Sequence, residues 1–356
     1  MKIFITGICG FVGSSLARGL REALPKARIS GVDNLVRPGS EINCRVLKPL
    51  GIKVVHGDIR NASDLETLSP ADWIIDAAAN PSVMAGIDGK TSSRQLVEHN
   101  LMGTVNILEL CRKWSSGMIM ISTSRVYSIP ALAGLKMMIR DKAFVPAPQS
   151  MKTDGMTPDG ITEEFSARSP VSLYGATKLA SENLALEYGS TYNLPVFVNR
   201  CGVLAGAGQF GKSDQGVFSF WIHSYCRRAP LRYIGFKGKG YQVRDCLHPL
   251  DLVALIRRQM VRPNATSVRV LNIGGGVANS MSLAQLSAWC AERFGPHRIG
   301  VRPEKRPFDI PWLILNAEQA RKIWKWKPAV GLEQVLDEIA RHAEQNPCWL
   351  DMCADR

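Results

Sequence analysis

Hydrophobic residues in positions 1–200 fall into short runs that alternate with longer amphipathic stretches. The short runs are rich in β-branched and aromatic side chains, which is typical of buried strands. The stretches between them repeat hydrophobic side chains every three or four residues, as a helix packed on a core does. This alternation predicts an α/β fold with a doubly wound parallel sheet and right-handed crossovers. The expected strands are 2–5, 28–32, 53–56, 73–76 and 118–121, and the expected helices are 14–24, 93–114 and 174–190.

A glycine-rich turn follows the first expected strand, with glycines at Gly7, Gly10 and Gly13. Glycines in this place allow a tight turn, close approach of the backbone to a pyrophosphate, and close packing of helix on strand. The N-terminus of the next helix offers free amides to the phosphates. Asp33, at the end of the second strand, can accept hydrogen bonds from both hydroxyls of an adenosine ribose and would repel a 2′-phosphate. A purely structural glycine turn is the alternative, but strand, turn, helix, strand and acid in this order favour a site for NAD rather than NADP.

Small and polar residues follow the other expected strands. The third strand leads to Gly57-Asp58-Ile59-Arg60, and the fourth leads to Ala77-Ala78-Ala79-Asn80, where small side chains let the backbone approach a cofactor. Ligands of parallel sheets bind at the carboxyl ends of the strands. These residues are therefore expected to meet at one edge of the sheet.

A tyrosine and a lysine open the expected helix 174–190. Tyr174 and Lys178 are four residues apart and face the same side of that helix. A lysine cation beside a phenol favours the phenolate, so the pKa of the tyrosine is expected to fall toward the working pH. Thr123, at the end of the fifth strand, can hold the same substrate hydroxyl. An exposed helix pair is the alternative, which the dinucleotide pattern and the preceding Ser122-Thr123 disfavour.

Composition and charge limit the classes of protein to which this chain can belong. The 356 residues are 46% hydrophobic and 21% charged, as in globular proteins, and no apolar run reaches the roughly 18 residues of a membrane span. The N-terminus lacks the pattern of a secretory signal, so a cytoplasmic location is expected. The nine cysteines include no Cys-x-x-Cys pair and the six histidines show no zinc spacing, so no metal is expected. The net charge of +13 favours anionic partners but does not choose among nucleic acid, acidic lipid and phosphorylated small molecules.

Together these motifs resemble the extended short-chain dehydrogenase/reductases of the NAD-dependent sugar epimerase/dehydratase type, over nearly the whole chain. The resemblance implies a Rossmann-type doubly wound sheet with a smaller, partly interleaved C-terminal domain that binds a nucleotide sugar. It also implies Tyr174 as the base, Lys178 as its electrostatic partner and ribose ligand, and Thr123 as the contact of the reacting hydroxyl. The motifs that carry the resemblance are Thr6-Gly7-x-x-Gly10-x-x-Gly13, Asp33-Asn34-Leu35, Gly57-Asp58-Ile59-Arg60, Asn100, Ser122-Thr123, Tyr174-x-x-x-Lys178 and Arg244-Asp245-x-x-His248.

The resemblance assigns the remaining contacts residue by residue. For NAD it implies Gly7, Gly10, Phe11, Val12, Gly13, Asp33, Asn34, Asp58, Ile59, Ala77, Ala78, Ala79, Asn100, Tyr174 and Lys178. For the substrate it implies Thr123, Gln209, Phe210, Asp214, Gln215, Arg244 and Arg306. The two arginines would clamp the diphosphate, a task suited to a planar guanidinium. An ordinary surface ion pair between Arg244 and Asp245 is the alternative.

Within the family, the stretches 209–216, 240–248 and 272–283 resemble the CDP-paratose 2-epimerases. Dehydratases of the family follow the catalytic threonine with Asp-Glu, where this chain has Ser124 and Arg125, and reductases more often use NADPH. The expected reaction is therefore the inversion of carbon 2 of a CDP-deoxyhexose by transient oxidation to a keto-sugar and re-reduction. The alternatives are a UDP-sugar 4-epimerase, a dehydratase or reductase, and a non-enzymatic NAD- or RNA-binding protein.

The resemblance also implies two domains and an oligomer. An NAD-binding Rossmann domain is expected over 1–200, with 243–261 and 268–276 returning to it, and a nucleotide-sugar-binding domain over 201–356. Helices near 95–114 and 174–190 are expected to associate into a homodimer or homotetramer.

Two departures from the family pattern concern the substrate. Val203 stands where a side chain that donates to a phosphate is usual. Residues 128–168 form a long insertion before the tyrosine, and loops of that length are usually functional or mobile. The insertion is expected to shape the sugar pocket.

Overall fold

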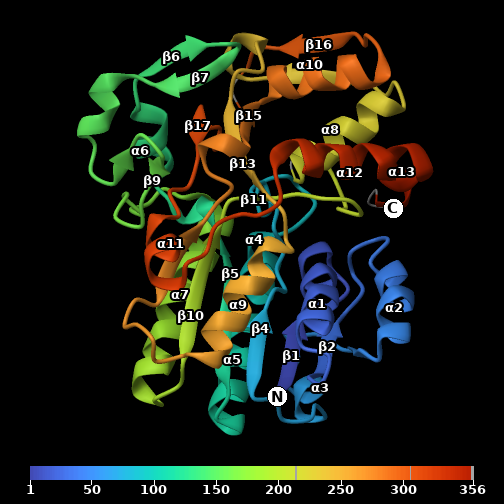
Figure 1. Ribbon diagram of the computed structural model, residues 1–356, viewed down its shortest axis with the longest axis vertical. Helices are drawn as coiled ribbons and strands as arrows, with labels where there is room; N and C mark the ends of the chain where they lie inside the picture. The colour runs from blue at the N-terminus through green and yellow to red at the C-terminus, as the bar shows by residue number, and fades with distance from the viewer. Residues whose placement is uncertain (213–214, 305, 354–356) are drawn as a thin grey trace.

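A seven-stranded parallel sheet forms the lower part of the molecule (Figure 1). The computed structural model describes residues 1–212, 215–304 and 306–353. The strand order is β14-β10-β5-β4-β1-β2-β3, and every neighbouring pair is parallel, which confirms the predicted doubly wound α/β class. The strands are β1 (Lys2–Thr6), β2 (Arg28–Asp33), β3 (Lys53–His56), β4 (Trp73–Asp76), β5 (Gly117–Thr123), β10 (Val196–Cys201) and β14 (Val270–Ile273).

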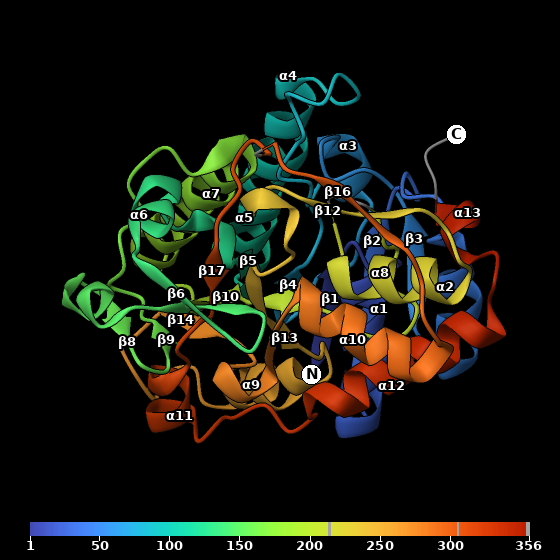
Figure 2. The ribbon, with the colours of Figure 1, turned by 90° about the horizontal axis from the view of Figure 1, so that it is seen from above.

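Helices cover both faces of this sheet because its strands are hydrophobic on both sides. One face carries α1 (Phe11–Ala23), α2 (Glu41–Leu47), α9 (Asp251–Val261) and α11 (Glu318–Trp324), and the other carries α3 (Ala62–Glu66), α5 (Gly103–Trp114) and α7 (Ser172–Thr191). In β1, Ile3 and Ile5 belong to the core of the first face and Phe4 to that of the second. Figure 2 shows α5 and α7 on one side of the strands and α9 and α11 on the other.

Two helices differ from the sequence expectation. α1 begins at Phe11 rather than at residue 14, because the amide of Ser14 already donates to the carbonyl of Gly10 (2.9 Å) and the glycine turn passes directly into the helix. The stretch 93–114 is interrupted by a π-helical turn, η2 (Glu98–Met102), between α4 (Ser93–Val97) and α5. Such turns often mark functional sites.

A smaller layer lies above the carboxyl ends of the parallel strands (Figure 1). Its hydrophobic core joins three helices to two small sheets and includes Trp221, Leu286 and Leu336. One sheet contains β11 (Val203–Leu204), β13 (Val243–Leu247), β15 (Ser280–Ser282) and β17 (Trp312–Leu313), and the other pairs β12 (Leu231–Ile234) with β16 (Ile299–Arg302). The helices are α8 (Val217–Cys226), α10 (Leu283–Phe294), α12 (Leu332–Gln345) and α13 (Trp349–Cys353).

The 128–168 insertion is folded and docks on this smaller layer. It contains α6 (Ile129–Gly134) and the hairpins β6 (Met137–Arg140) with β7 (Ala143–Pro146) and β8 (Met156–Thr157) with β9 (Gly160–Ile161). The amide of Phe144 donates to the carbonyl of Tyr241 (2.8 Å), and the Phe144 ring contacts the rings of Phe236 and Tyr241 edge to face. The insertion is therefore fixed beside the β13 strand.

The division into two domains stays a prediction. Of the segments expected to return to the first domain, 268–276 contributes β14 to the large sheet. Within 243–261, α9 packs on α1, whereas β13 belongs to one of the small sheets. Among the residues described, no helix has the length and apolar character needed to cross a bilayer.

Candidate active site

A cleft of about 1450 Å³ opens between the large sheet and the smaller layer. This volume exceeds the roughly 300–1,000 Å³ typical of a site for one small ligand. Its lower wall includes the glycine-rich turn, the end of β2 and the residues after β4. Its upper wall includes Gly211, Lys212, Gln215, Phe220, Arg302, Glu304, Arg306 and Pro307. The cleft lies at the strand ends, where the sequence predicted the ligands to bind.

The glycine-rich turn packs so closely on neighbouring backbone that two of its positions admit only glycine. Gly7 has a φ of +61°, and a Cβ atom there would lie 2.8 Å from the Cα of Ala78. A Cβ atom on Gly13 would lie 2.1 Å from the carbonyl oxygen of Gly7, so the helix can approach the turn only with glycine at this position. Gly10 lines the cleft, and α1 starts at the next residue. This cradle fits the pyrophosphate of a dinucleotide.

Asp33 lines the cleft at the end of β2. Its Oδ2 accepts from the amide of Cys9 and its Oδ1 from the amide of Leu35, each at 2.9 Å. Burial raises the pKa of Asp33, and these backbone bonds act against the rise. Each carboxylate oxygen has a second acceptor position. Asp33 can therefore still accept the hydroxyls of a ribose.

Asn34, Asp58 and Ile59 lie beside Asp33 but do not all face the cleft. Asn34 and Ile59 line it. The carboxylate of Asp58 accepts from Asn34 Nδ2 (2.9 Å) and pairs with Arg60 (2.7 Å). Burial alone would raise the pKa of Asp58, but the bonds from Arg60 and Asn34 hold it well below its usual range. Asp58 thus orients Asn34.

The residues after β4 are fixed by a buried polar network. The Oγ1 of Thr6 accepts from the amides of Ala77 (3.1 Å) and Ala78 (3.0 Å) and donates to Asp76 (2.7 Å). Ala77, Ala78 and Ala79 all line the cleft. The backbone of this turn is therefore held at the position expected to contact a cofactor.

Asn100 lies in the π-helical turn and is buried. Its Oδ1 accepts from the amide of Asn80 (2.7 Å), and its Nδ2 donates to the carbonyl of Asn80 (3.0 Å) and to Thr177 Oγ1 (3.2 Å). It joins the loop after β4 to α7. These contacts are structural, and a direct contact of Asn100 with NAD stays a prediction.

β5 ends at Thr123, which lies beside Tyr174 in the first turn of α7, and Lys178 follows one helical turn later. The side chains of Thr123 and Tyr174 share a hydrogen bond. Tyr174 is 7% exposed and Lys178 is 2% exposed. Both side chains are therefore buried, and neither is among the residues that line the cleft.

The pKa of Tyr174 differs from the sequence expectation. Burial raises it to about 12, while the bond from Thr123 and the charge of Arg125 act to lower it. Burial lowers the pKa of Lys178, with Asp76 and Glu182 acting against the fall. The cation that acts to lower the pKa of Tyr174 is thus Arg125, in the turn η3 (Ser124–Val126). The pKa is nevertheless raised, because burial disfavours the phenolate more than the neighbouring groups favour it.

A buried ion pair beneath these residues was missed by the sequence reasoning. Glu182 accepts from the hydroxyl of Ser122 and from Arg200 Nη2 (2.7 Å) and Nε (3.0 Å). The Arg200 guanidinium also lies 5.2 Å from the centre of the Tyr127 ring. The available signal was the spacing: Glu182 follows Tyr174 by eight residues and Lys178 by four, which places all three along one helix face.

The predicted substrate residues divide into those that face the cleft and those that support it. Gln215 and Arg306 line the cleft. Phe210 is buried and stacks on Trp349 at 5.5 Å between ring centres, and Gln209 Nε2 donates to the carbonyl of Leu204 (2.7 Å). Gln209 and Phe210 thus shape the loop in front of α8. Asp214 lies outside the described residues.

Three arginines surround one carboxylate near Tyr174. Arg125, Arg244 and Arg306 each act to lower the pKa of Asp309, although burial raises it overall. Arg244 donates to the carbonyls of Val243 (2.7 Å) and Ile310 (2.9 Å), and burial together with the Arg125 charge lowers its pKa to about 9. The alternative of a surface ion pair for Arg244 is therefore wrong. The cluster suits a polyanionic ligand.

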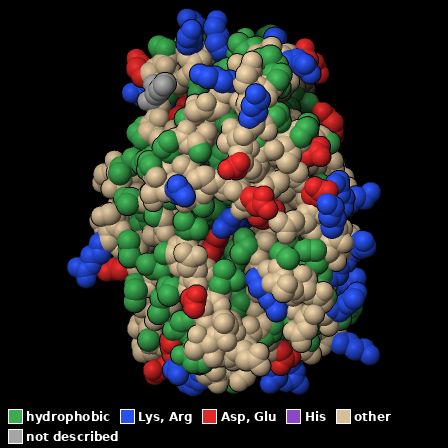
Figure 3. Space-filling view, turned by 90° about the vertical axis from the view of Figure 1, so that its left-hand side faces the viewer, with side chains coloured by type: hydrophobic (Ala, Val, Ile, Leu, Met, Phe, Trp, Pro, Cys, Tyr) green, Lys and Arg blue, Asp and Glu red, His purple; other side chains and the backbone are tan. Residues whose placement is uncertain are grey.

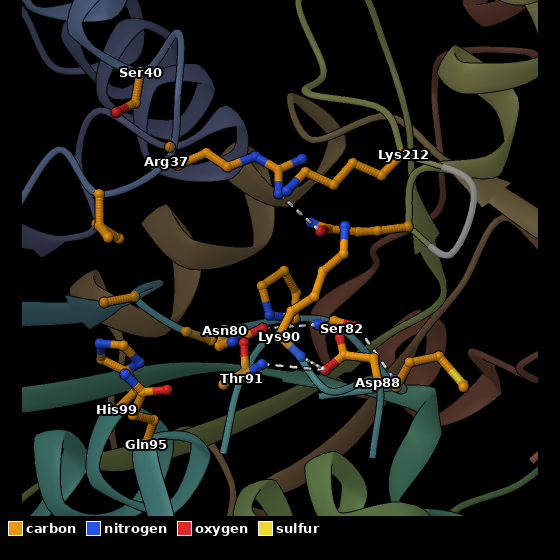
Figure 4. Close-up of a pocket in the computed structure, with 18 of the residues that line it drawn as sticks. Arg37, Ser40, Asn80, Ser82, Asp88, Lys90, Thr91, Gln95, His99 and Lys212 are labelled. Atoms are coloured by element: carbon orange, nitrogen blue, oxygen red, sulfur yellow. Dashed lines mark hydrogen bonds between the residues drawn. The ribbon is translucent and has the colours of Figure 1, made fainter. Parts of the chain in front are cut away.

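Figure 4 shows further cationic residues that the motifs did not include. Arg37, after β2, and Lys212, from the smaller layer, extend toward each other across the cleft. Arg37 donates to Gln215 Oε1 (3.3 Å) and to the carbonyl of Phe210. On the lower side, Asp88 Oδ1 accepts from the amide of Lys90 (3.0 Å), which orders the loop before α4.

Comparison with known proteins identifies the family. The family model described as "NAD dependent epimerase/dehydratase family" matches residues 3–274. The CDP-paratose 2-epimerase of Salmonella typhi is 31% identical over 80% of this chain and 82% of its own length, and the UDP-glucuronate 4-epimerase of Thermodesulfobacterium geofontis is 24% identical over 96% of both. The X-ray structure of Pal from Bacillus thuringiensis superposes with a TM-score of 0.77 at 25% identity, covering 97% of this chain and 99% of Pal. The chain therefore belongs to the NAD dependent epimerase/dehydratase family, and its cofactor is NAD.

Proposed function

We propose that this protein is a nucleotide-sugar epimerase that inverts carbon 2 of a CDP-deoxyhexose. The observation that carries the proposal is the arginine beside the candidate base. Arg125 is close enough to Tyr174 for its charge to act on the phenol, and it stands where the family resemblance puts the glutamate of a dehydratase. A guanidinium stays protonated and cannot exchange the proton that the elimination of water requires. A reaction that removes and returns hydrogen at one carbon does not need that group.

The residues proposed to hold NAD lie along the lower wall of the cleft. Gly10 leaves room for the pyrophosphate, Asp33 accepts the hydroxyls of the adenosine ribose, and the backbone after β4 approaches the nicotinamide side. When bound, NAD supplies the hydride acceptor and donor of the reaction.

The chain's own residues handle the proton. Tyr174, as a phenolate, takes the proton of the sugar hydroxyl, and Thr123, whose side chain bonds to Tyr174 in this structure, turns to hold the same hydroxyl. Lys178, one helical turn further, is proposed to stabilise the phenolate. Tyr174 returns the proton when the carbonyl is reduced, so the cycle is balanced in protons.

Inversion requires the flat keto-sugar to present its second face. Arg244 and Arg306 are proposed to hold the diphosphate while the sugar turns. Their position above the strand ends, near Arg125 and Asp309, supports this role because planar guanidinium groups bind phosphate oxygens in pairs.

The similarity to a CDP-paratose 2-epimerase supports the CDP-sugar. A second candidate is a UDP-sugar 4-epimerase, which is favoured by the similarity to a UDP-glucuronate 4-epimerase along nearly the whole of both chains. Conversion of CDP-paratose, UDP-glucose and UDP-glucuronate, followed by NMR of the sugar, separates the two. Conversion of the CDP-sugar alone supports the proposal, and conversion of a UDP-sugar alone contradicts it.

We also propose that the protein forms a homodimer or a dimer of dimers. Exposed hydrophobic side chains lie on α4, the π-helical turn and α7, with Val97 38%, Met102 46% and Leu173 40% exposed. Figure 3, which faces the side of α6 and α7, shows hydrophobic side chains on this face interspersed with acidic and basic ones. Sedimentation that shows a fully active monomer at low concentration would contradict this assembly.

A further inference from the structure

Two cysteines touch beneath the glycine-rich turn. Cys9 lies within the turn and Cys44 lies on α2, and their sulfur atoms are 3.2 Å apart. Cys9 is 0% exposed, whereas Cys44 is partly exposed. No step of the proposed reaction uses either thiol.

The backbone of Cys9 links the proposed NAD site to α2. Its amide donates to Asp33 Oδ2 (2.9 Å), the carboxylate proposed to bind the ribose. Its carbonyl accepts from Asn43 Nδ2 (2.8 Å), and Asn43 is the neighbour of Cys44. Any movement of Cys9 toward α2 therefore acts directly on Asp33 and on the turn.

We propose that Cys9 and Cys44 form an oxidant-sensitive modification site, which closes to a disulfide and thereby weakens the binding of NAD. A disulfide requires a sulfur–sulfur distance of about 2.05 Å, so the two side chains must approach each other. The turn cannot follow freely, because Gly7 and Gly13 already pack against backbone atoms. The proposal concerns the NAD site and is independent of which sugar the enzyme takes.

The chemistry is balanced with a peroxide as the oxidant. The more accessible Cys44 sulfur attacks one oxygen of hydrogen peroxide, the O–O bond breaks, and Cys44 becomes a sulfenic acid as one water leaves. The Cys9 sulfur then attacks the Cys44 sulfur, the S–O bond breaks, and a second water leaves. Burial, the contact with Cys44 and the charge of Asp33 raise the pKa of Cys9, which makes it the second thiol to react rather than the first. Two thiols of dithiothreitol reverse the reaction.

The test follows the covalent bond and the bound cofactor separately. Purified protein loaded with NAD is treated with hydrogen peroxide and passed through a desalting column, and the NAD that remains is measured. The oxidised wild type should lose two hydrogens by intact mass, yield a peptide pair joined through Cys9 and Cys44, and retain about tenfold less NAD than the reduced protein. Dithiothreitol should restore retention.

Two variants and one control make the result specific. Cys44→Ser and Cys44→Ala should retain NAD after oxidation, and the use of both guards against a folding defect in one of them. Cys226→Ser, a partly buried cysteine on α8, should behave as the wild type. Absence of the joined peptide, retention of NAD by the disulfide form, or equal loss of NAD from the Cys44 variants would each overturn the proposal.

Discussion

Replacement of Tyr174 by phenylalanine is the sharpest perturbation of the proposed site. The change removes one oxygen atom, and the ring stays in its contacts with Ala85 and Leu96. The hydrogen bond to Thr123 is lost, but that hydroxyl also accepts from the amide of Arg125 (3.2 Å) and keeps a partner. The fold and the glycine-rich turn are therefore unchanged.

The expected loss is large because the change removes the phenolic oxygen that is proposed to take the proton. Arg125, the cation whose charge acts on the phenol, is a guanidinium and does not act as a base at neutral pH. Removal of a general base typically costs about a hundredfold to ten-thousandfold in rate, which corresponds to about 3–5 kcal/mol in the activation free energy. We expect kcat for the CDP-sugar to fall by this amount.

The assay follows sugar conversion by NMR and bound NAD by mass spectrometry of the denatured protein. Tyr127→Phe is the matched control, because Tyr127 is also a buried tyrosine but donates to Asn272 (2.6 Å), away from Thr123. Tyr174→Phe should bind NAD as the wild type does and be nearly inactive. Turnover of Tyr174→Phe within a few-fold of the control would refute the assignment of Tyr174 as the base.

Three further substitutions test other parts of the site. Gly13→Ala should abolish retention of NAD in a desalting assay, since its Cβ atom would lie 2.1 Å from a carbonyl oxygen of the same turn; normal retention would contradict the cradle. Glu182→Ala should lower the free energy of unfolding by about 3–5 kcal/mol, because it leaves the buried Arg200 without its carboxylate partner. A change of less than about 1 kcal/mol in a urea titration would show that the ion pair is not needed for stability. Arg125→Met should raise the pKa of Tyr174, because it removes a cation that favours the phenolate, so the rise of kcat with pH should move to higher pH; an unmoved pH profile would exclude this influence.

The sequence could predict that the residues of the lower wall lie together, because each of them belongs to a local motif. Each motif there follows a strand of β-branched residues, and parallel strands bring their ends to one edge. Gly7, Asp33 and Ala77 therefore lie together as expected, although they come from three separate segments. The start of α1 and the π-helical turn were missed because both depend on how the backbone passes from turn to helix, which hydrophobic spacing does not record.

The upper half was less predictable because its contacts join distant segments. Arg37 meets Gln215 across 178 positions of sequence, and no local pattern indicates such a pair. The pKa of Tyr174 was expected to be low from its spacing to Lys178, but burial is a tertiary property and it outweighs the neighbouring charges. Motifs thus indicated the candidate reacting groups, whereas packing decides their electrostatics.

The most direct test of the central claim follows the hydrogen at the inverted carbon. The proposed reaction removes one hydrogen from this carbon as a hydride and returns the same hydrogen to its other face, with Tyr174 exchanging only the hydroxyl proton. CDP-paratose deuterated at carbon 2 should therefore yield an inverted product that keeps its deuterium in ordinary water, as measured by NMR and mass spectrometry. Loss of the deuterium to solvent during turnover would show deprotonation at carbon instead, and would contradict epimerisation by transient oxidation.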